Sequence, residues 1–256
     1  MKKLISLYKK KVDNISLEFQ RYLISSINTN QRLIGIKGAR GVGKTTLLLQ
    51  ILKNLPLNKS LYASLDDLYF STHSLVELAE QFALKGGQYL YLDEVHKYNN
   101  WSQELKNIYD SYPELKIIFT SSSALEIHKG SYDLSRRALM FDLPGLSFRE
   151  FLEFRYNIRI QPVDLSDILF KQDKIASKIL LEIKPYEFFE EYLSIGYYPY
   201  FKEDEEYYLQ RLESVIRLVV ETDLPAIYKI DYSSISKLKK LIMIIGGISP
   251  YTPNLK

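Results

Sequence analysis

The stretch LIGIKGARGVGKTTLLLQIL, residues 33–52, contains the pattern that decides the fold. Its first four residues are apolar and predict a buried strand, while leucines and an isoleucine at helical spacing after Thr46 predict a helix. Between them, Gly38–Thr45 reads GARGVGKT and fits G-x-x-x-x-G-K-[ST] at every fixed position. A strand, a glycine-rich loop and a helix in this order are typical of a phosphate-binding P-loop, the Walker A motif.

Each part of this loop has a predicted task. Glycines let the backbone curl around an anion, and the following helix adds the positive end of its dipole. We expect Lys44 to reach the β- and γ-phosphates of a nucleotide and the hydroxyl of Thr45 to bind Mg²⁺. A glycine-rich turn that binds nothing is the alternative, and the flanking strand and helix argue against it. The predicted nucleotide-binding residues are Gly38, Ala39, Arg40, Gly41, Val42, Gly43, Lys44, Thr45 and Thr46.

The composition is that of a globular protein with a large core. The chain has 256 residues, of which 46% are hydrophobic, and a net charge of +3 that neither demands nor excludes a nucleic-acid partner. The absence of cysteine excludes disulfides and thiolate chemistry, and we expect a cytoplasmic protein. The longest apolar run, residues 241–245, falls far short of the roughly 20 residues that a membrane helix needs.

A second pattern, QYLYLDE at residues 88–94, predicts a buried strand that runs into two carboxylates. Buried acids are costly unless a cation or a water molecule needs them. We expect Asp93 to hold the magnesium shell, as in a Walker B motif, and Glu94 to polarise the attacking water. The alternative is a pair of solvated acids at an exposed strand end.

Two further groups of polar residues are candidates for the same site. A strand at 116–123 ends in four hydroxyl residues, and one of them could contact the γ-phosphate or the attacking water, or cap a helix from about Ala124. Arg136 and Arg137 precede a strand at 138–143. Either arginine could face a γ-phosphate bound by a neighbouring subunit, or form a surface ion pair. The residues alone leave these alternatives open.

The rest of the chain is predicted to be helical. We divide it into an N-terminal helical segment at 1–30, a P-loop core at 31–158, a helical lid-like domain at 159–245 and a final segment at 246–256. Candidate helices lie near 163–183, 186–194, 204–221 and 233–245. Tyrosine and phenylalanine are dense there, and their helical spacing favours core packing over a platform for nucleic-acid bases.

Taken together, these stretches resemble the P-loop ATPases of the AAA+ group. The matching segments are GARGVGKTTLL, YLYLDEVHKYNNW, IIFTSSSALEI, DLSRRALMFDLPGLSFREFL, EYLSIGYYPYF and VVETDLPAIYKID. The particular likeness is to bacterial and archaeal AAA family ATP-binding proteins, in which the AAA domain is joined to a C-terminal domain of unknown function. The resemblance implies a three-layer α/β/α fold with a parallel sheet in the order 5-1-4-3-2, and ATP with Mg²⁺ as ligands. It also implies Glu94 as catalytic base, Ser122 or a neighbour as sensor, and Arg136 or Arg137 as arginine finger.

The function expected from this resemblance is Mg²⁺-dependent ATP hydrolysis coupled to conformational change. The alternatives are an ATP-controlled switch with little turnover and a small-molecule kinase, although the Asp93-Glu94 pair favours hydrolysis over transfer. The finger implies a homo-oligomer, and the helical C-terminal part suggests a protein partner. Residues 246–256 resemble the lead-in to a winged helix whose recognition helix is missing. We therefore expect a shortened chain without a nucleic-acid partner.

Overall fold

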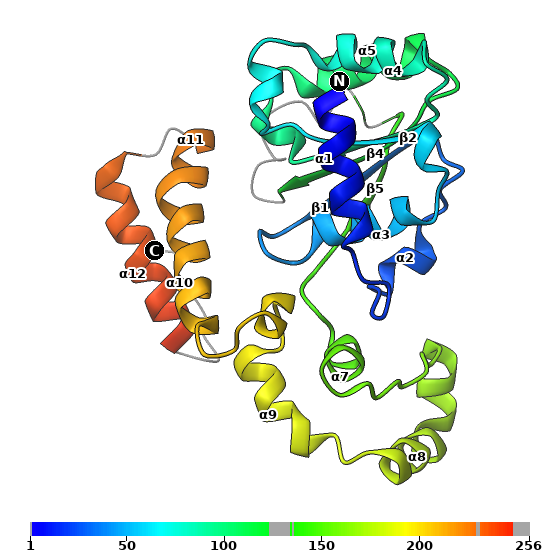
Figure 1. Cartoon of the computed structure of the whole chain (residues 1–256). Helices are drawn as coiled ribbons and strands as arrows, with labels where there is room; N and C mark the ends of the chain where they lie inside the picture. The colour runs from blue at the N-terminus through cyan, green and yellow to red at the C-terminus, as the bar shows by residue number, and fades with distance from the viewer. Residues whose placement is uncertain (1, 123–133, 135, 229–230, 248–256) are drawn as a thin grey trace.

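A five-stranded parallel sheet forms the centre of the protein, which is described here by a computed structural model covering residues 2–122, 134, 136–228 and 231–247 (Figure 1). The strands are β1 (Leu33–Gly38), β2 (Ser60–Ser64), β3 (Tyr89–Asp93), β4 (Lys116–Ser122) and β5 (Leu139–Asp142). They pair in the order β5-β1-β4-β3-β2, and every pair is parallel. The predicted strand order is confirmed.

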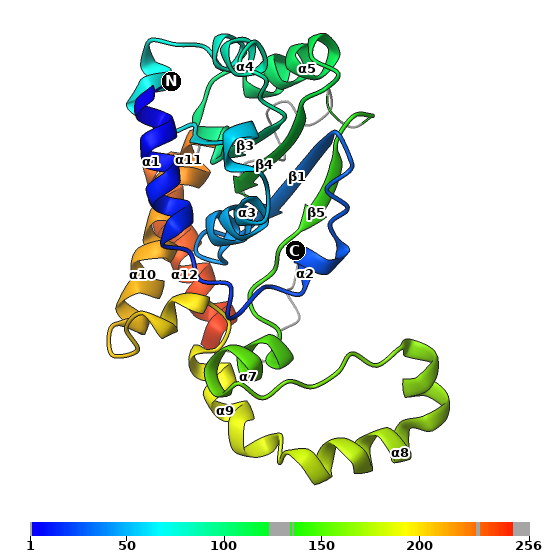
Figure 2. The same cartoon turned by 45° about the vertical axis from the view of Figure 1, so that its right-hand side comes forward.

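Helices cover both faces of this sheet. Helix α3 (Lys44–Lys53) connects β1 to β2, whereas α4 (Leu75–Ala83) and α5 (Trp101–Ser111) connect β2 to β3 and β3 to β4. The first connection crosses the sheet in one direction and the other two return, so right-handed crossovers put α3 on the face opposite α4 and α5 (Figures 1 and 2). Helix α1 (Lys2–Asp13) packs beside α3. This arrangement is the predicted three-layer α/β/α fold.

The segment between α1 and the sheet differs from the prediction. The segment at 1–30 was predicted to be helical, but residues 14–22 are not helical and α2 (Leu23–Ser26) is a single turn. Side chains of α3 satisfy the backbone of this segment instead. Gln50 donates to the carbonyl oxygens of Ser16 and Phe19 at 2.9 and 2.7 Å, and Lys53 donates to that of Ile15 at 2.7 Å. The segment is thereby held against the P-loop helix.

Beyond β5 the regular elements among the described residues are helices, as predicted. The helices are α7 (Phe148–Tyr156), α8 (Leu165–Glu182), α9 (Tyr186–Ile195), α10 (Tyr208–Leu218), α11 (Leu224–Tyr228) and α12 (Tyr232–Gly247). A π-helical turn, η5 (Val219–Asp223), joins α10 to α11, and short 3-10 turns are η1 (Leu57–Lys59), η2 (Leu68–Ser71), η3 (Val95–Lys97) and η4 (Pro199–Lys202). Helix α8 extends away from the rest of the molecule (Figures 1 and 2).

The helical part has a core of its own. Phe151 of α7 packs with Leu146, Phe201 and Tyr208, and the partly buried Tyr192 packs against this cluster. Phe189 and Tyr197 are exposed, so the predicted core packing holds for only part of the dense aromatic residues. This second core begins at Leu146, within the range 31–158 that we predicted as P-loop core. Ser123, the alternative helix from Ala124 and the predicted winged-helix lead-in from residue 248 onward lie outside the described residues.

Candidate nucleotide-binding site

The P-loop adopts the backbone conformation that its glycines permit. Gly41 and Gly43 have φ angles of +87° and +94°, in the left-handed region that side chains disfavour. Gly43 is the N-cap of α3, so the loop leads directly into the helix that carries Lys44 and Thr45. The backbone N–H groups of the first turn of that helix are therefore available to an anion.

A cleft of about 980 Å³ opens beside this loop. Its walls come from the 14–22 segment, the P-loop and α3, the end of β3, α7, and the η4 turn. The lining residues are Ile15, Ser16, Glu18, Phe19, Arg21, Arg40, Gly41, Val42, Gly43, Lys44, Thr45, Thr46, Gln50, Glu94, Glu153, Phe154, Arg155, Asn157, Pro199, Tyr200, Lys202 and Glu203. The cleft thus combines most of the predicted phosphate-binding loop with Glu94, the predicted catalytic base.

Lys44 is held inside the loop by its own backbone. Its side chain donates to the carbonyl oxygens of Gly38 and Ala39 at 2.9 and 3.0 Å, and the residue is only 5% exposed. Burial lowers the pKa of Lys44, while the nearby carboxylates of Glu94 and Asp93 oppose that shift. An ammonium group in this position is poorly solvated and well placed to pair with phosphate oxygens.

The two predicted magnesium ligands lie together. The hydroxyl of Thr45 donates to Oδ2 of Asp93 at 2.6 Å, although 48 positions separate the two residues in the chain. Tyr62 donates to the same oxygen at 2.8 Å, and the hydroxyl of Thr120 donates to Oδ1. A buried carboxylate beside a hydroxyl at the edge of a phosphate loop is an oxygen donor set that fits Mg²⁺.

Glu94 follows directly in an unusual backbone conformation. Its φ and ψ angles are 52° and 41°, which strain a residue other than glycine, and its N–H donates to the hydroxyl of Thr120 at 3.0 Å. Burial raises the pKa of the Glu94 carboxyl, Lys44 opposes the shift, and Asp93 adds to it. A carboxylate with a raised pKa on the wall of a cleft is suited to accept a proton.

Of the remaining predicted site residues, Ser122 lies near the P-loop, whereas Arg136 and Arg137 lie at the other end of the sheet. Ser122 is buried at the end of β4 beside Gly38 of the P-loop. Arg136 and Arg137 instead precede β5, whose first residue pairs with Ile34 near the start of β1, at the edge of the sheet opposite the P-loop. Arg137 forms a bidentate contact with Asp110, both N–O distances being 3.0 Å. Neither arginine lines the cleft of its own chain, and the roles of all three residues stay predictions.

Sequence reasoning missed His96, which lies beside Glu94. Its Nδ1 accepts a hydrogen bond from the N–H of Ser122 at 3.2 Å, and its Nε2 lies 3.2 Å from a carboxylate oxygen of Glu94. Burial, together with the positive charges of Lys97 and Lys44, lowers the pKa of His96 to about 4, so the ring is neutral at pH 7. The only signal in the sequence is its place in LDEVH, directly after the two acids.

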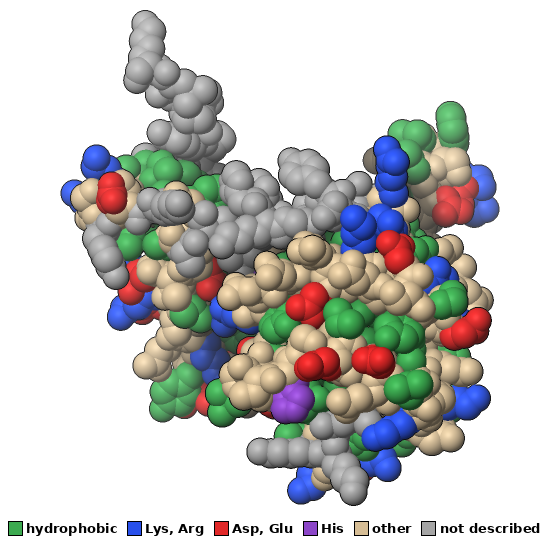
Figure 3. Space-filling view, turned by 90° about the horizontal axis from the view of Figure 1, so that it is seen from above, with side chains coloured by type: hydrophobic (Ala, Val, Ile, Leu, Met, Phe, Trp, Pro, Cys, Tyr) green, Lys and Arg blue, Asp and Glu red, His purple; other side chains and the backbone are tan. Residues whose placement is uncertain are grey.

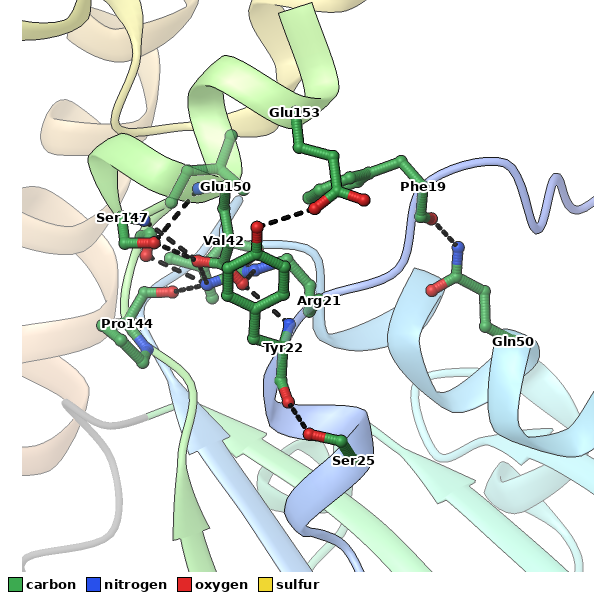
Figure 4. A network of polar contacts seen from close by, with 12 residues as sticks. Phe19, Arg21, Tyr22, Ser25, Val42, Gln50, Pro144, Ser147, Glu150 and Glu153 are labelled. Carbon is green, nitrogen blue, oxygen red and sulfur yellow. Dashed lines mark hydrogen bonds and ion pairs between the residues drawn. The ribbon is translucent and has the colours of Figure 1, made fainter. Parts of the chain in front are cut away.

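Arg21 is the second residue that sequence reasoning missed, and it connects three parts of the cleft (Figure 4). Its guanidinium donates to Glu150 of α7 at 2.9 Å and to the carbonyl oxygen of Val42 in the P-loop at 2.8 Å. It also donates to the carbonyl oxygens of Pro144 and Gly145 at 2.8 and 2.9 Å. Burial alone would raise the pKa of Glu150, but the hydrogen bonds from Arg21 and from backbone N–H groups lower it.

Asp223 brings the C-terminal helices to the P-loop. It ends the π-helical turn η5, is only 3% exposed, and places one oxygen 3.5 Å from Nη2 of Arg40 and the other 3.6 Å from Nζ of Lys97. The oxygen facing Arg40 completes no hydrogen bond within the described part of the chain. The cost of burying this negative charge is therefore offset by two partly exposed cations, Arg40 and Lys97.

The sheet order and the P-loop geometry define a P-loop fold with a candidate nucleotide-binding site. Residues 30–152 match the family described as the AAA domain, so this part of the chain is similar to P-loop proteins of the AAA type. No helix in the described ranges is long and apolar enough to cross a membrane. On the face seen from above in Figure 3, acidic and basic side chains are interspersed.

Similar proteins extend over different shares of the chain. An uncharacterized protein of Methanocaldococcus jannaschii is 32% identical over 237 residues, which are 86% of this chain and 49% of the relative, so the chain spans about half the relative's length. The structure of C. elegans PCH-2 is 20% identical with a TM-score of 0.37, over 60% of this chain and 44% of that one. A structure described for katanin self-assembly is 18% identical with a TM-score of 0.35, over 48% and 44%. The two structural likenesses are too distant to carry an argument about function.

Proposed function

We propose that this chain binds ATP with Mg²⁺ and hydrolyses it, and that the bound nucleotide changes the position of the C-terminal helices. The observation that carries the proposal is the contact of 2.6 Å between the Thr45 hydroxyl and Asp93, with Glu94 next in the chain on the cleft wall. A phosphate loop that binds nothing has no need of a buried carboxylate at its floor.

Each residue then has one task in the reaction. Lys44 and the loop N–H groups bind the β- and γ-phosphates, and Thr45 and Asp93 hold the metal ion. Bound Mg²⁺ would neutralise charge on the phosphate oxygens. Glu94 orients the attacking water and accepts its proton as the water oxygen bonds to the γ-phosphorus. The bond from that phosphorus to the bridging oxygen breaks, and ADP leaves with this oxygen.

The coupling part of the proposal rests on Asp223. Arg40 lines the cleft and also pairs with Asp223, the last residue of the π-helical turn η5 that follows α10. A triphosphate in the cleft competes with Asp223 for Arg40, because phosphate carries the higher charge. Loss of this partner leaves a buried carboxylate under-compensated and favours displacement of the helix. The same observation favours the second candidate function, a nucleotide-controlled switch with little turnover.

Steady-state ATP hydrolysis by the purified protein with Mg²⁺ tests this proposal. We expect Glu94→Gln to keep nucleotide binding and to lower kcat by a factor on the order of 10² to 10⁴. Lys44→Ala should weaken binding roughly 10- to 100-fold, since it removes hydrogen bonds to charged oxygens. Wild type that binds ATP but turns it over no faster than Glu94→Gln would establish the switch. Unchanged binding by Lys44→Ala would overturn both functions.

The concentration dependence of this rate tests the predicted arginine finger. Arg136 and Arg137 lie away from the cleft of their own chain, so either could act only on a nucleotide bound by a neighbour. We expect specific activity to rise with protein concentration if the active form is an oligomer. A specific activity that is constant over a hundredfold range of concentration would count against a finger at either position.

A further inference from the structure

A buried histidine lies between the end of β4 and the proposed catalytic base. The side chain of His96 is 5% exposed and comes from the η3 turn, directly after β3. It is absent from the residues that line the cleft. A side chain in this position can act on Glu94 without touching the nucleotide.

The hydrogen bond at one ring nitrogen fixes the state of the other. A backbone N–H can only donate, so Nδ1 of His96, which receives the N–H of Ser122, carries no proton. In the neutral ring the proton is then on Nε2, the atom 3.2 Å from the carboxylate of Glu94. That N–H completes no hydrogen bond within the described residues, and it faces a carboxylate that is 25% exposed.

The backbone of Glu94 is anchored by a hydrogen bond, whereas its carboxylate completes none within the described residues and only lies close to His96. The N–H of Glu94 donates to Thr120, and the left-handed φ of 52° fixes the direction in which the side chain leaves the chain. A small rotation of the Glu94 carboxylate would let it accept a hydrogen bond from the Nε2–H of His96. The His96 ring is in turn hydrogen-bonded to Ser122 at the end of β4. A buried donor without a partner gains free energy when such a bond forms.

We propose that His96 is a positioning residue, which holds the carboxylate of Glu94 toward the attacking water and ties its orientation to the end of β4. This inference rests on the proposed function, because it gives Glu94 the task of a base. A misplacement of about 1 Å of a reacting group can lower a rate about 100-fold, so an anchor at this distance is sufficient to affect turnover.

The test compares two replacements of His96 in the full chain. His96→Leu fills a similar space with apolar atoms and removes both ring nitrogens that can form hydrogen bonds. We expect kcat to fall about 10- to 100-fold with KM unchanged. His96→Gln can accept from Ser122 with its carbonyl oxygen and donate to Glu94 with its amide, and we expect it to restore most of kcat. His73→Leu, the matched replacement of an exposed histidine, should leave both constants unchanged.

A double-mutant cycle separates positioning from a purely structural role. If His96 acts through Glu94, His96→Leu should have no further effect on kcat in a Glu94→Gln background. Equal losses in both backgrounds, or a His96→Gln variant as slow as His96→Leu, would overturn the inference. Full activity of His96→Leu beside an inactive Glu94→Gln would overturn it while leaving the proposed function intact. Wild type no faster than Glu94→Gln would remove the proposed hydrolysis, and the inference with it.

Discussion

The surroundings of Glu94 raise the pKa of its carboxyl, and this shift can be tested. Burial raises the pKa above the ordinary value of 4.5, Lys44 opposes the shift, and the charge of Asp93 adds to it. A base works only when deprotonated, so activity is present above the raised pKa and is lost as the pH falls through it. We expect kcat/KM, which reports ionisation of the free protein, to drop about tenfold per pH unit on the acid side, from a midpoint above 4.5.

The pH dependence of kcat/KM measures this directly. Glu94→Gln is the matched control. Its amide does not titrate, so its residual rate should not fall at acid pH for this reason. A wild-type profile whose acid midpoint lies at or below that of an ordinary glutamate would contradict the assignment of Glu94 as the base.

At the scale of residues, the sequence predicts those site residues that belong to short continuous motifs. Lys44 and Thr45 belong to one motif, and Asp93 and Glu94 end one strand, so their proximity follows once the strands are adjacent. Thr120 was only one of four hydroxyl candidates, and His96 was assigned no task. The contacts of Thr120 with the two acids and of His96 with Ser122 depend on how β4 lies against its neighbours, which no local pattern encodes.

At the scale of elements, Arg21 holds together the 14–22 segment, the P-loop and α7. Arg21→Met would leave the carboxylate of Glu150 buried without its main partner, and we expect a loss of about 3 to 5 kcal/mol in the free energy of unfolding. Denaturant titration measures this loss. The double variant Arg21→Met/Glu150→Leu should recover part of it, because no unpaired charge remains.

A surface pair provides the comparison for this experiment. Arg217 and Glu213 are 62% and 68% exposed, so Arg217→Met should change the free energy of unfolding by less than about 1 kcal/mol. Equal effects of Arg21→Met and Arg217→Met would mean that the buried network does not join the elements as its contacts indicate.

The same elements mark the limit of prediction from local sequence. Helices with clear apolar periodicity were found, and Ser147 and Glu150 form the capping box that begins α7. The strand order came from the resemblance rather than from the residues. Residues 14–22 interrupt the helical segment predicted at 1–30, which contains two helices. Hydrogen bonds from Gln50 and Lys53, more than 30 positions away, satisfy the backbone of residues 14–22 in another conformation.

At the scale of the whole molecule, the contact of Asp223 with the P-loop joins the helical part to the nucleotide cleft. Neither VVETD nor the P-loop predicts this contact, because it depends on how two separately packed parts meet. The buried negative charge of Asp223 lies beside Arg40 and Lys97, the cations that a triphosphate would attract. By linkage, whatever Asp223 gains from Arg40 opposes nucleotide binding to the same extent.

Asp223→Asn therefore tests the coupling between the two parts. The substitution is nearly isosteric and removes one negative charge, so we expect the Kd for Mg-ATP to fall by a factor of roughly 3 to 10 at low salt and by less at high salt. Hydrogen exchange over residues 208–228 should speed up when wild type binds Mg-ATP, and should already be fast in the variant. Glu213→Gln removes an exposed acid of α10 and should change neither readout. Weaker ATP binding by Asp223→Asn would mean that Asp223 supports the site, and that the C-terminal helices are held in place by nucleotide rather than released by it.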